Sequence, residues 1–85
     1  MLNIFHSSQV VHMFNEENLI IHGISKREWE VLQLMSQGYS NQEIANQLFV
    51  SINTIKTHSS SLFEKLEVNR RIQAIEKAKK LGLLP

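Results

Sequence analysis

The sequence predicts an all-α fold, a compact four-helix domain with an irregular or partly helical N-terminal extension. Three observations predict it: two capping boxes open helical patterns, apolar residues recur at helical spacing, and glycines follow two of those patterns. A chain of 85 residues without cysteine makes one small domain that has no disulfide or thiolate metal site. We expect residues 1–23 to be an extension or linker and residues 24–85 to be the folded domain.

The N-terminal extension carries mixed signals. Its first half has the apolar spacing of a short helix, whereas residues 19–21 fit either a buried extended run or another half-turn. The histidines His6, His12 and His22 suggest a metal site, but no two of them stand three or four residues apart. One helix face therefore cannot present two of them as ligands. We predict no metal and no cofactor.

A first helix begins after Ser25. Ser25 and Glu28 form a capping box, and Ile24 and Trp29 stand where a hydrophobic staple would pack across it. The helical pattern continues until Gly38, which supplies the left-handed residue that commonly ends a helix. We interpret Arg27 and Glu28 as an internal pair that fixes this helix against the others, rather than as contacts to a partner.

The next two helices form a predicted helix-turn-helix over residues 41–60. Ser40 and Glu43 make a second capping box, and Ser51 is the expected N-cap of the third helix. Only residues 48–50 separate the two helices, so they must cross at a steep angle. The apolar faces that would meet are Ile44, Ala45 and Leu48 on the second helix, and Ile52, Ile55, Leu62 and Leu66 on the third. Staples recur as Tyr39 with Ile44 and Val50 with Ile55.

The opposite face of the third helix is polar. It carries Asn53, Lys56, Thr57, Ser60 and Ser61. Short hydroxyls and one lysine suit a DNA major groove, because they can bond to base edges without filling the groove. Residues 1–49 carry two basic and five acidic side chains, a net charge of −3, whereas residues 50–85 carry seven basic and three acidic ones, a net charge of +4. Positive charge therefore accompanies the proposed reading helix, as binding to phosphates requires.

A fourth helix is predicted from Arg70 to Leu81, with Asn69 as its expected cap. Gly82 closes it, and residues 83–85 either tuck back or fray. Its small and apolar side chains could let two copies of the chain pack closely, and packing on the core is the competing explanation. The dimer candidates are Ile72, Ala74, Ile75 and Ala78.

Four blocks of residues carry a resemblance to a known family. They are Ser25-x-Arg27-Glu28-x-Glu30-Val31-Leu32, Gly38-x-Ser40-Asn41-x-Glu43-Ile44-Ala45, Ser51-x-x-Thr54-Ile55-Lys56-Thr57-His58, and Lys65-Leu66-x-Val68 with Arg71-x-Gln73-Ala74. In order and spacing, the segment from Ser25 to Leu83 resembles the LuxR-type DNA-binding domain of bacterial transcriptional regulators, also called the FixJ, GerE or NarL type. Glu67 stands where many relatives have a glycine, and Ser59 stands where they often have an apolar residue.

The resemblance implies that the third helix enters the major groove of duplex DNA and that the fourth helix pairs two copies. We assign base contacts to Lys56, Thr57, Ser60 and Ser61. We assign phosphate contacts to Asn41, Ser51, Asn53, Thr54 and Lys65. His58 is interpreted as structural, packed between helices.

The predicted function is that of a bacterial transcriptional regulator that binds specific duplex DNA as a homodimer, with RNA polymerase as a further partner to consider. Two alternatives are a module resembling region four of a sigma factor and a helix-turn-helix that binds protein. No nucleophile, metal-ligand or phosphate-loop pattern predicts an enzyme. Without an apolar run of about 18 residues or a signal peptide, we expect no membrane contact and a cytoplasmic location. Related domains usually follow a sensor domain, so the chain is either an excised output domain or a stand-alone regulator.

Overall fold

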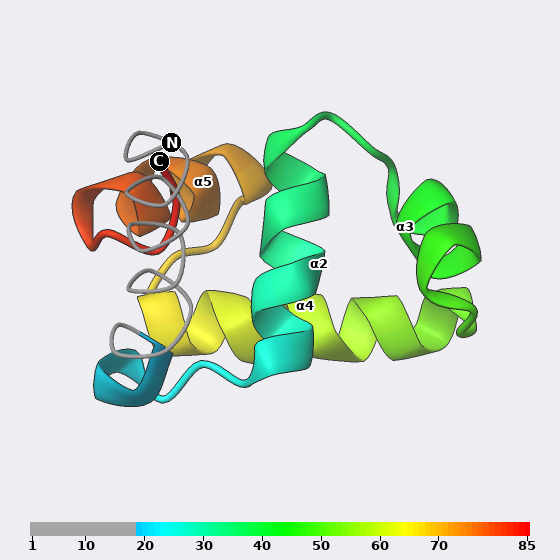
Figure 1. The fold of residues 1–85 in the computed structure, drawn as a ribbon, viewed down its shortest axis with the longest axis horizontal. Coiled ribbons are helices and arrows are strands. Elements are labelled where there is room, and N and C mark those ends of the chain that lie inside the picture. The colour runs from blue at the N-terminus through cyan, green and yellow to red at the C-terminus, as the bar shows by residue number, and fades with distance from the viewer. Residues whose placement is uncertain (1–18) are drawn as a thin grey trace, which may run out of the picture.

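The computed structural model describes residues 19–85, which are helical apart from their connections (Figure 1). A helical turn at residues 19–22 precedes four helices, α2 (Lys26–Ser36), α3 (Asn41–Leu48), α4 (Ile52–Leu66) and α5 (Arg71–Lys80). The all-α class and the four predicted helices are confirmed. The turn at residues 19–22 resolves the ambiguity there in favour of helix, whereas the segment before it, whose spacing fits a short helix, lies outside the described residues.

α4 is the longest helix and contacts each of the other three (Figure 1). α2 crosses its middle, α3 packs at its N-terminal end, and α5 lies toward its C-terminal end. Within the described part of the chain, no helix is long and apolar enough to cross a membrane. The arrangement leaves one side of α4 exposed from Asn53 to Glu64.

Both predicted capping boxes are present. The Ser25 hydroxyl accepts from the Glu28 amide at 3.1 Å, and the Glu28 carboxylate accepts from the Ser25 amide at 2.9 Å. Ser40 and Glu43 repeat this exchange at 3.2 and 2.9 Å. The hydroxyl of Ser51 accepts from an amide in the first turn of α4 at 3.1 Å, so it is the N-cap. Each helix of the helix-turn-helix therefore starts where local side-chain chemistry satisfies its free amides.

Two helices end on a left-handed residue that is not glycine. Phe49 ends α3 with φ 59°, and Glu67 ends α4 with φ 58°. α2 ends as expected, since Gly38 follows it with φ 94°. A left-handed conformation costs a residue with a Cβ about 1 kcal/mol. At Phe49 no packing of its own side chain offsets that cost, because the side chain is 93% exposed.

The core consists of two clusters that share α2 and α4. The first cluster joins the helical turn at residues 19–22, α2, α4, α5 and the C-terminal tail around Trp29, Leu32, Leu62 and Leu66. The second cluster joins α2, α3 and α4 around Val31, Met35, Ile44, Ala45 and Ile55. The residues of each predicted staple fall in the same cluster. The second cluster therefore sets the crossing of α3 and α4, and the first attaches α5 to α2 and α4.

The C-terminal tail tucks back into the first cluster. The Leu83 amide donates to the Ala78 carbonyl at 2.8 Å, and both Leu83 and Leu84 are buried. The indole Nε1 of Trp29 donates to the Leu83 carbonyl at 3.0 Å. Of the alternatives for residues 83–85, the structure therefore shows the tucked one.

The start of α5 differs from the prediction. Arg70 occupies the N-cap position without a side-chain hydrogen bond, so the expected Asn69 cap is wrong. The Gln73 side chain instead accepts from the Asn69 amide at 3.2 Å. Arg71 reaches across the molecule and donates to the backbone carbonyl of Tyr39, in the connection between α2 and α3. The beginning of α5 is thus held by Gln73 in its first turn and by the Tyr39 carbonyl at the entrance to the helix-turn-helix.

Candidate nucleic-acid interface

α4 presents a buried face and an exposed polar face. Its buried residues are Ile55, Ser59, Leu62 and Leu66. On the opposite side, at spacings of four, three and four residues, stand the exposed side chains Asn53, Thr57, Ser60 and Glu64. We call these four residues the groove stripe. Lys56 is exposed at the edge of the stripe, so one cation and three short uncharged side chains are available to a ligand along this helix.

The structure brings together three of the four predicted base contacts. Thr57 and Ser60 lie on the groove stripe, and Lys56 lies beside it. Ser61 does not join them: it is half-buried, and its hydroxyl forms a hydrogen bond that helps to lower the pKa of the Glu28 carboxyl. Ser61 therefore faces α2, because it follows Ser60 by one residue and a helix turns by a large angle at each step.

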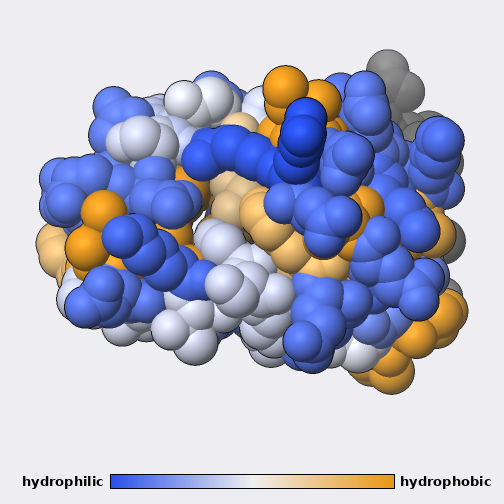
Figure 2. Space-filling view, turned by 180° about the vertical axis from the view of Figure 1, so that it is seen from behind, coloured by the Kyte–Doolittle hydropathy of each residue, from blue (hydrophilic) through white to orange (hydrophobic). Residues whose placement is uncertain are grey.

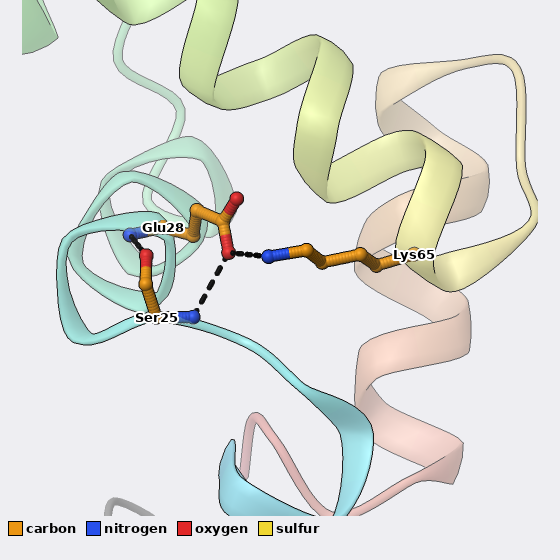
Figure 3. Close-up of polar contacts among 3 residues, drawn as sticks. All are labelled: Ser25, Glu28 and Lys65. Carbon is orange, nitrogen blue, oxygen red and sulfur yellow. Dashed lines mark hydrogen bonds and ion pairs between the residues drawn. The ribbon is translucent and has the colours of Figure 1, made fainter.

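The predicted phosphate contact at Lys65 is likewise engaged inside the molecule. Its ammonium lies 2.8 Å from Glu28 Oε1, and Figure 3 shows the same carboxylate oxygen accepting from the Ser25 amide. Burial raises the pKa of Glu28, but the hydrogen bonds from Lys65, Ser61 and the Ser25 amide outweigh it and lower the pKa to about 2. The internal pairing expected of Glu28 is confirmed, with Lys65 as its partner. The expectation is wrong for Arg27, which pairs with Glu30 on the exposed surface of α2 and, among the described residues, fixes no other helix.

The N-terminus of α4 gathers the other predicted phosphate contacts of this helix. Ser51 Oγ lies 3.0 Å from Thr54 Oγ1, and Asn53 is exposed between them. The first turn of α4 contains no acidic residue, so the positive end of the helix dipole is not neutralised by a carboxylate of its own. Asn41 opens α3, and its Oδ1 is buried without a hydrogen-bond partner in the described chain. These residues belong to the two helix starts of the helix-turn-helix.

Two residues with consequences for binding or stability escaped the sequence analysis. Glu64 continues the groove stripe one turn beyond Ser60, and the four-residue spacing from Ser60 could have found it. The second is Ser59, whose hydroxyl is buried against the core with no partner among residues 19–85. The sequence marked Ser59 only as a departure from an apolar position, because burial of one hydroxyl depends on the neighbouring helix.

The predicted dimer residues divide between core and surface. Ala74 and Ala78 are fully buried in the first cluster, so their side chains are already packed within one chain. Ile75 is half-buried, and Ile72 is 70% exposed. Seen from behind, the surface is largely hydrophilic, with small separate apolar areas (Figure 2). Of the four candidates, only Ile72 and Ile75 therefore leave apolar surface exposed on α5.

Comparisons with known proteins agree with this geometry. The family model described as bacterial regulatory proteins of the luxR family matches residues 22–78. The HTH-type transcriptional regulator MalT of Yersinia pestis (strain Pestoides F) is 48% identical over 58 residues, which cover 68% of this chain and 6% of MalT. The transcriptional regulatory protein DegU of Brevibacillus brevis is 45% identical over 62 residues, which cover 73% of this chain and 26% of DegU.

A solved structure shows the same fold. The crystal structure of the response regulator ChrA, from a heme-sensing two-component system, superposes with a TM-score of 0.69 and 43% identity over 71% of this chain and 30% of ChrA. The chain thus spans less than a third of each of these longer proteins. Domains of this family bind DNA and are not enzymes. The matched residues contain all of α2, α3 and α4, and the chain belongs to the luxR family of bacterial regulatory proteins as a helix-turn-helix DNA-binding domain.

Proposed function

We propose that this domain binds specific sequences of duplex DNA by inserting α4 into the major groove, as the output domain of a bacterial transcriptional regulator. The observation that carries the proposal is the groove stripe, defined above, on the side of α4 opposite the core. Thr57 and Ser60 occupy its middle, and Lys56 flanks it. Hydroxyl and ammonium groups on one exposed helix face can bond to base edges and to a neighbouring phosphate.

Phosphate contacts follow from the helix starts. Ser51 and Asn53 lie at the positive end of α4, and Asn41 lies at the start of α3. With α4 in the groove, these positions would face the sugar-phosphate backbone that flanks it. Lys65 no longer belongs in this set, since removing its ammonium from Glu28 would leave a buried carboxylate unpaired.

Binding to a pool of random duplexes, followed by sequencing of the retained DNA at several salt concentrations, tests specific recognition. We expect one enriched motif and a weaker salt dependence for Lys56→Ala, because one cation near phosphate is lost. Enrichment of no motif, together with unchanged retention by Lys56→Ala, would contradict the proposal. Two alternatives remain: a helix-turn-helix that binds protein and a module of the sigma-factor type. A protein-binding module would enrich no DNA motif, and its retention of DNA would not depend on Lys56.

We also propose that two copies pair through α5 when they bind DNA. Support comes from Ile72, a large apolar side chain that is 70% exposed on this helix, with the half-buried Ile75 beside it. Sedimentation on and off DNA tests the pairing, with Ile72→Ala as the variant and Lys80→Ala, in the last turn of α5, as its control. If the protein sediments only as a monomer at high concentration, both with and without DNA, the proposed pairing through α5 is wrong. That RNA polymerase is a further partner stays a prediction, which rests on the family resemblance.

A further inference from the structure

The hydroxyl of Thr57 is already engaged within α4. Its Oγ1 donates a hydrogen bond to the backbone carbonyl of Asn53, one turn earlier, at 3.0 Å. Threonine adopts this arrangement in helices because its hydroxyl can reach the carbonyl four residues back. The single proton of the hydroxyl is therefore directed at the protein backbone. A base edge that needs a hydrogen-bond donor would have to compete with that bond.

With its hydroxyl proton turned inward, Thr57 offers its γ-methyl as a contact group that needs no hydrogen bond. The residue is exposed and lies in the middle of the groove stripe. Its stripe neighbours Asn53 and Ser60 end in polar groups, and within residues 19–85 no hydrogen bond or ion pair engages either of these side chains. The stripe thus combines one aliphatic methyl with polar side chains on both sides.

Only one base presents a methyl group in the major groove, namely thymine at its C5 position. Apolar contact with that methyl is the recognition chemistry that a threonine methyl can supply without breaking its own hydrogen bond. Redirecting the hydroxyl to a base would forfeit the bond to Asn53, which favours the methyl contact over a donated hydrogen bond.

We propose that Thr57 is a specificity-determining residue that reads a thymine through a methyl-to-methyl contact, while its hydroxyl stays bonded to the Asn53 carbonyl. This inference rests on the proposed insertion of α4 into the major groove. It assigns the bound DNA a thymine opposite Thr57, with an adjoining base left to Ser60 and the phosphate contact proposed above left to Asn53.

The test replaces each thymine of the enriched motif by deoxyuridine, one position at a time and in both half-sites together. Deoxyuridine removes only the C5 methyl and keeps the pairing with adenine. We expect one position at which the substitution weakens binding of the wild-type domain by about three- to fivefold, the worth of one buried methyl group. The other thymines should tolerate the change.

Two variants identify the residue that senses this methyl. Thr57→Val keeps the γ-methyl and removes the hydroxyl, so it should retain the sensitivity to deoxyuridine. Thr57→Ser keeps the hydroxyl and removes the methyl, so it should bind thymine and deoxyuridine duplexes equally. Circular dichroism of both variants checks that the exposed substitution leaves the fold intact.

The outcomes separate this inference from the function on which it rests. Failure to enrich any motif would count against specific DNA binding itself. An enriched motif with no position sensitive to deoxyuridine would overturn the thymine contact alone. Equal sensitivity in Thr57→Ser and the wild type, or loss of binding in Thr57→Val but not in Thr57→Ser, would show that the methyl of Thr57 is not the reading group.

Discussion

The Lys65 ammonium lies 2.8 Å from the Glu28 carboxylate and joins the last turn of α4 to the first turn of α2 (Figure 3). The same carboxylate oxygen closes the capping box at Ser25. One side chain therefore serves both the start of a helix and the crossing of two helices. The Glu28 side chain is only 5% exposed, so its charge depends on these partners rather than on water.

Replacing Lys65 by methionine should lower the free energy of unfolding by about 1–3 kcal/mol, because it leaves a buried carboxylate without its charged partner. Urea unfolding followed by circular dichroism measures the change. Lys56→Met is the matched control: Lys56 is exposed on the same helix, and its replacement should change stability by less than about 0.5 kcal/mol while weakening DNA binding. Equal stability of the two variants would contradict the structural role of Lys65.

Lowering the pH should remove the contribution of the ionised Glu28 carboxylate to the free energy of unfolding. Its pKa is lowered from 4.5 to about 2 in the folded domain, so between these values the unfolded chain binds more protons than the folded one. The stabilisation is therefore complete above pH about 4.5 and disappears as the pH falls toward 2. We expect the difference in unfolding free energy between wild type and Glu28→Gln to shrink by about 2–3 kcal/mol over this range.

Urea unfolding of both proteins at a series of pH values measures that difference. Glu30→Gln, on the same helix, is the control, since Glu30 pairs with Arg27 on the exposed surface at 3.2 Å. If the difference for Glu28→Gln stays constant with pH, the pKa of Glu28 is not lowered.

Ser59→Ala should raise the free energy of unfolding by about 1 kcal/mol, because the buried hydroxyl of Ser59 has no partner among the described residues. Alanine also has a higher helix propensity than serine. Ser60→Ala, in the same helix, is therefore the control for the stability gained from helix propensity alone. Thermal unfolding of the two variants isolates the difference due to burial. If Ser59→Ala is less stable than the wild type, the Ser59 hydroxyl makes a hydrogen bond that stabilises the fold.

Glu64→Gln should strengthen DNA binding by about two- to fivefold at low salt, since Glu64 places a negative charge on the groove stripe near phosphates. The gain should fade as salt rises. Fluorescence anisotropy with the enriched duplex measures it, and Glu30→Gln on α2 serves as the control away from the stripe. Weaker binding by Glu64→Gln would instead indicate that the carboxylate accepts a hydrogen bond from a base, as it can from cytosine N4.

Local signals were enough to predict much of this fold. The capping boxes at Ser25 and Ser40 involve residues three apart, and the staples involve residues five apart, so their geometry follows from short stretches of chain. Phe49 could not be anticipated as a left-handed residue, because that conformation is uncommon for such a side chain, whereas the glycine that many relatives have in place of Glu67 pointed to it. Phe49 lies in the turn between α3 and α4, and Glu67 lies where α4 ends before α5.

The site was harder to predict at its edges. Thr57 and Ser60 lie opposite the core, where helical periodicity alone places them on the surface. Ser61 and Lys65 lie on the flank of α4, and only the position of α2 decides that they face Glu28 rather than a ligand. Ala74 was open to two interpretations for the same reason, since its burial depends on how α5 docks.

The bond from Trp29 to Leu83 makes the C-terminal tail a part of the core rather than an appendage. Trp29 lies at the start of α2, but its acceptor and the buried Leu84 stand more than fifty residues further along the chain. The buried residues of the cluster around Ile44, in contrast, all lie in α2, α3 and α4. The packing within the helix-turn-helix is therefore independent of the tail, whereas the packing that holds α5 is complete only with Leu83 and Leu84 in place.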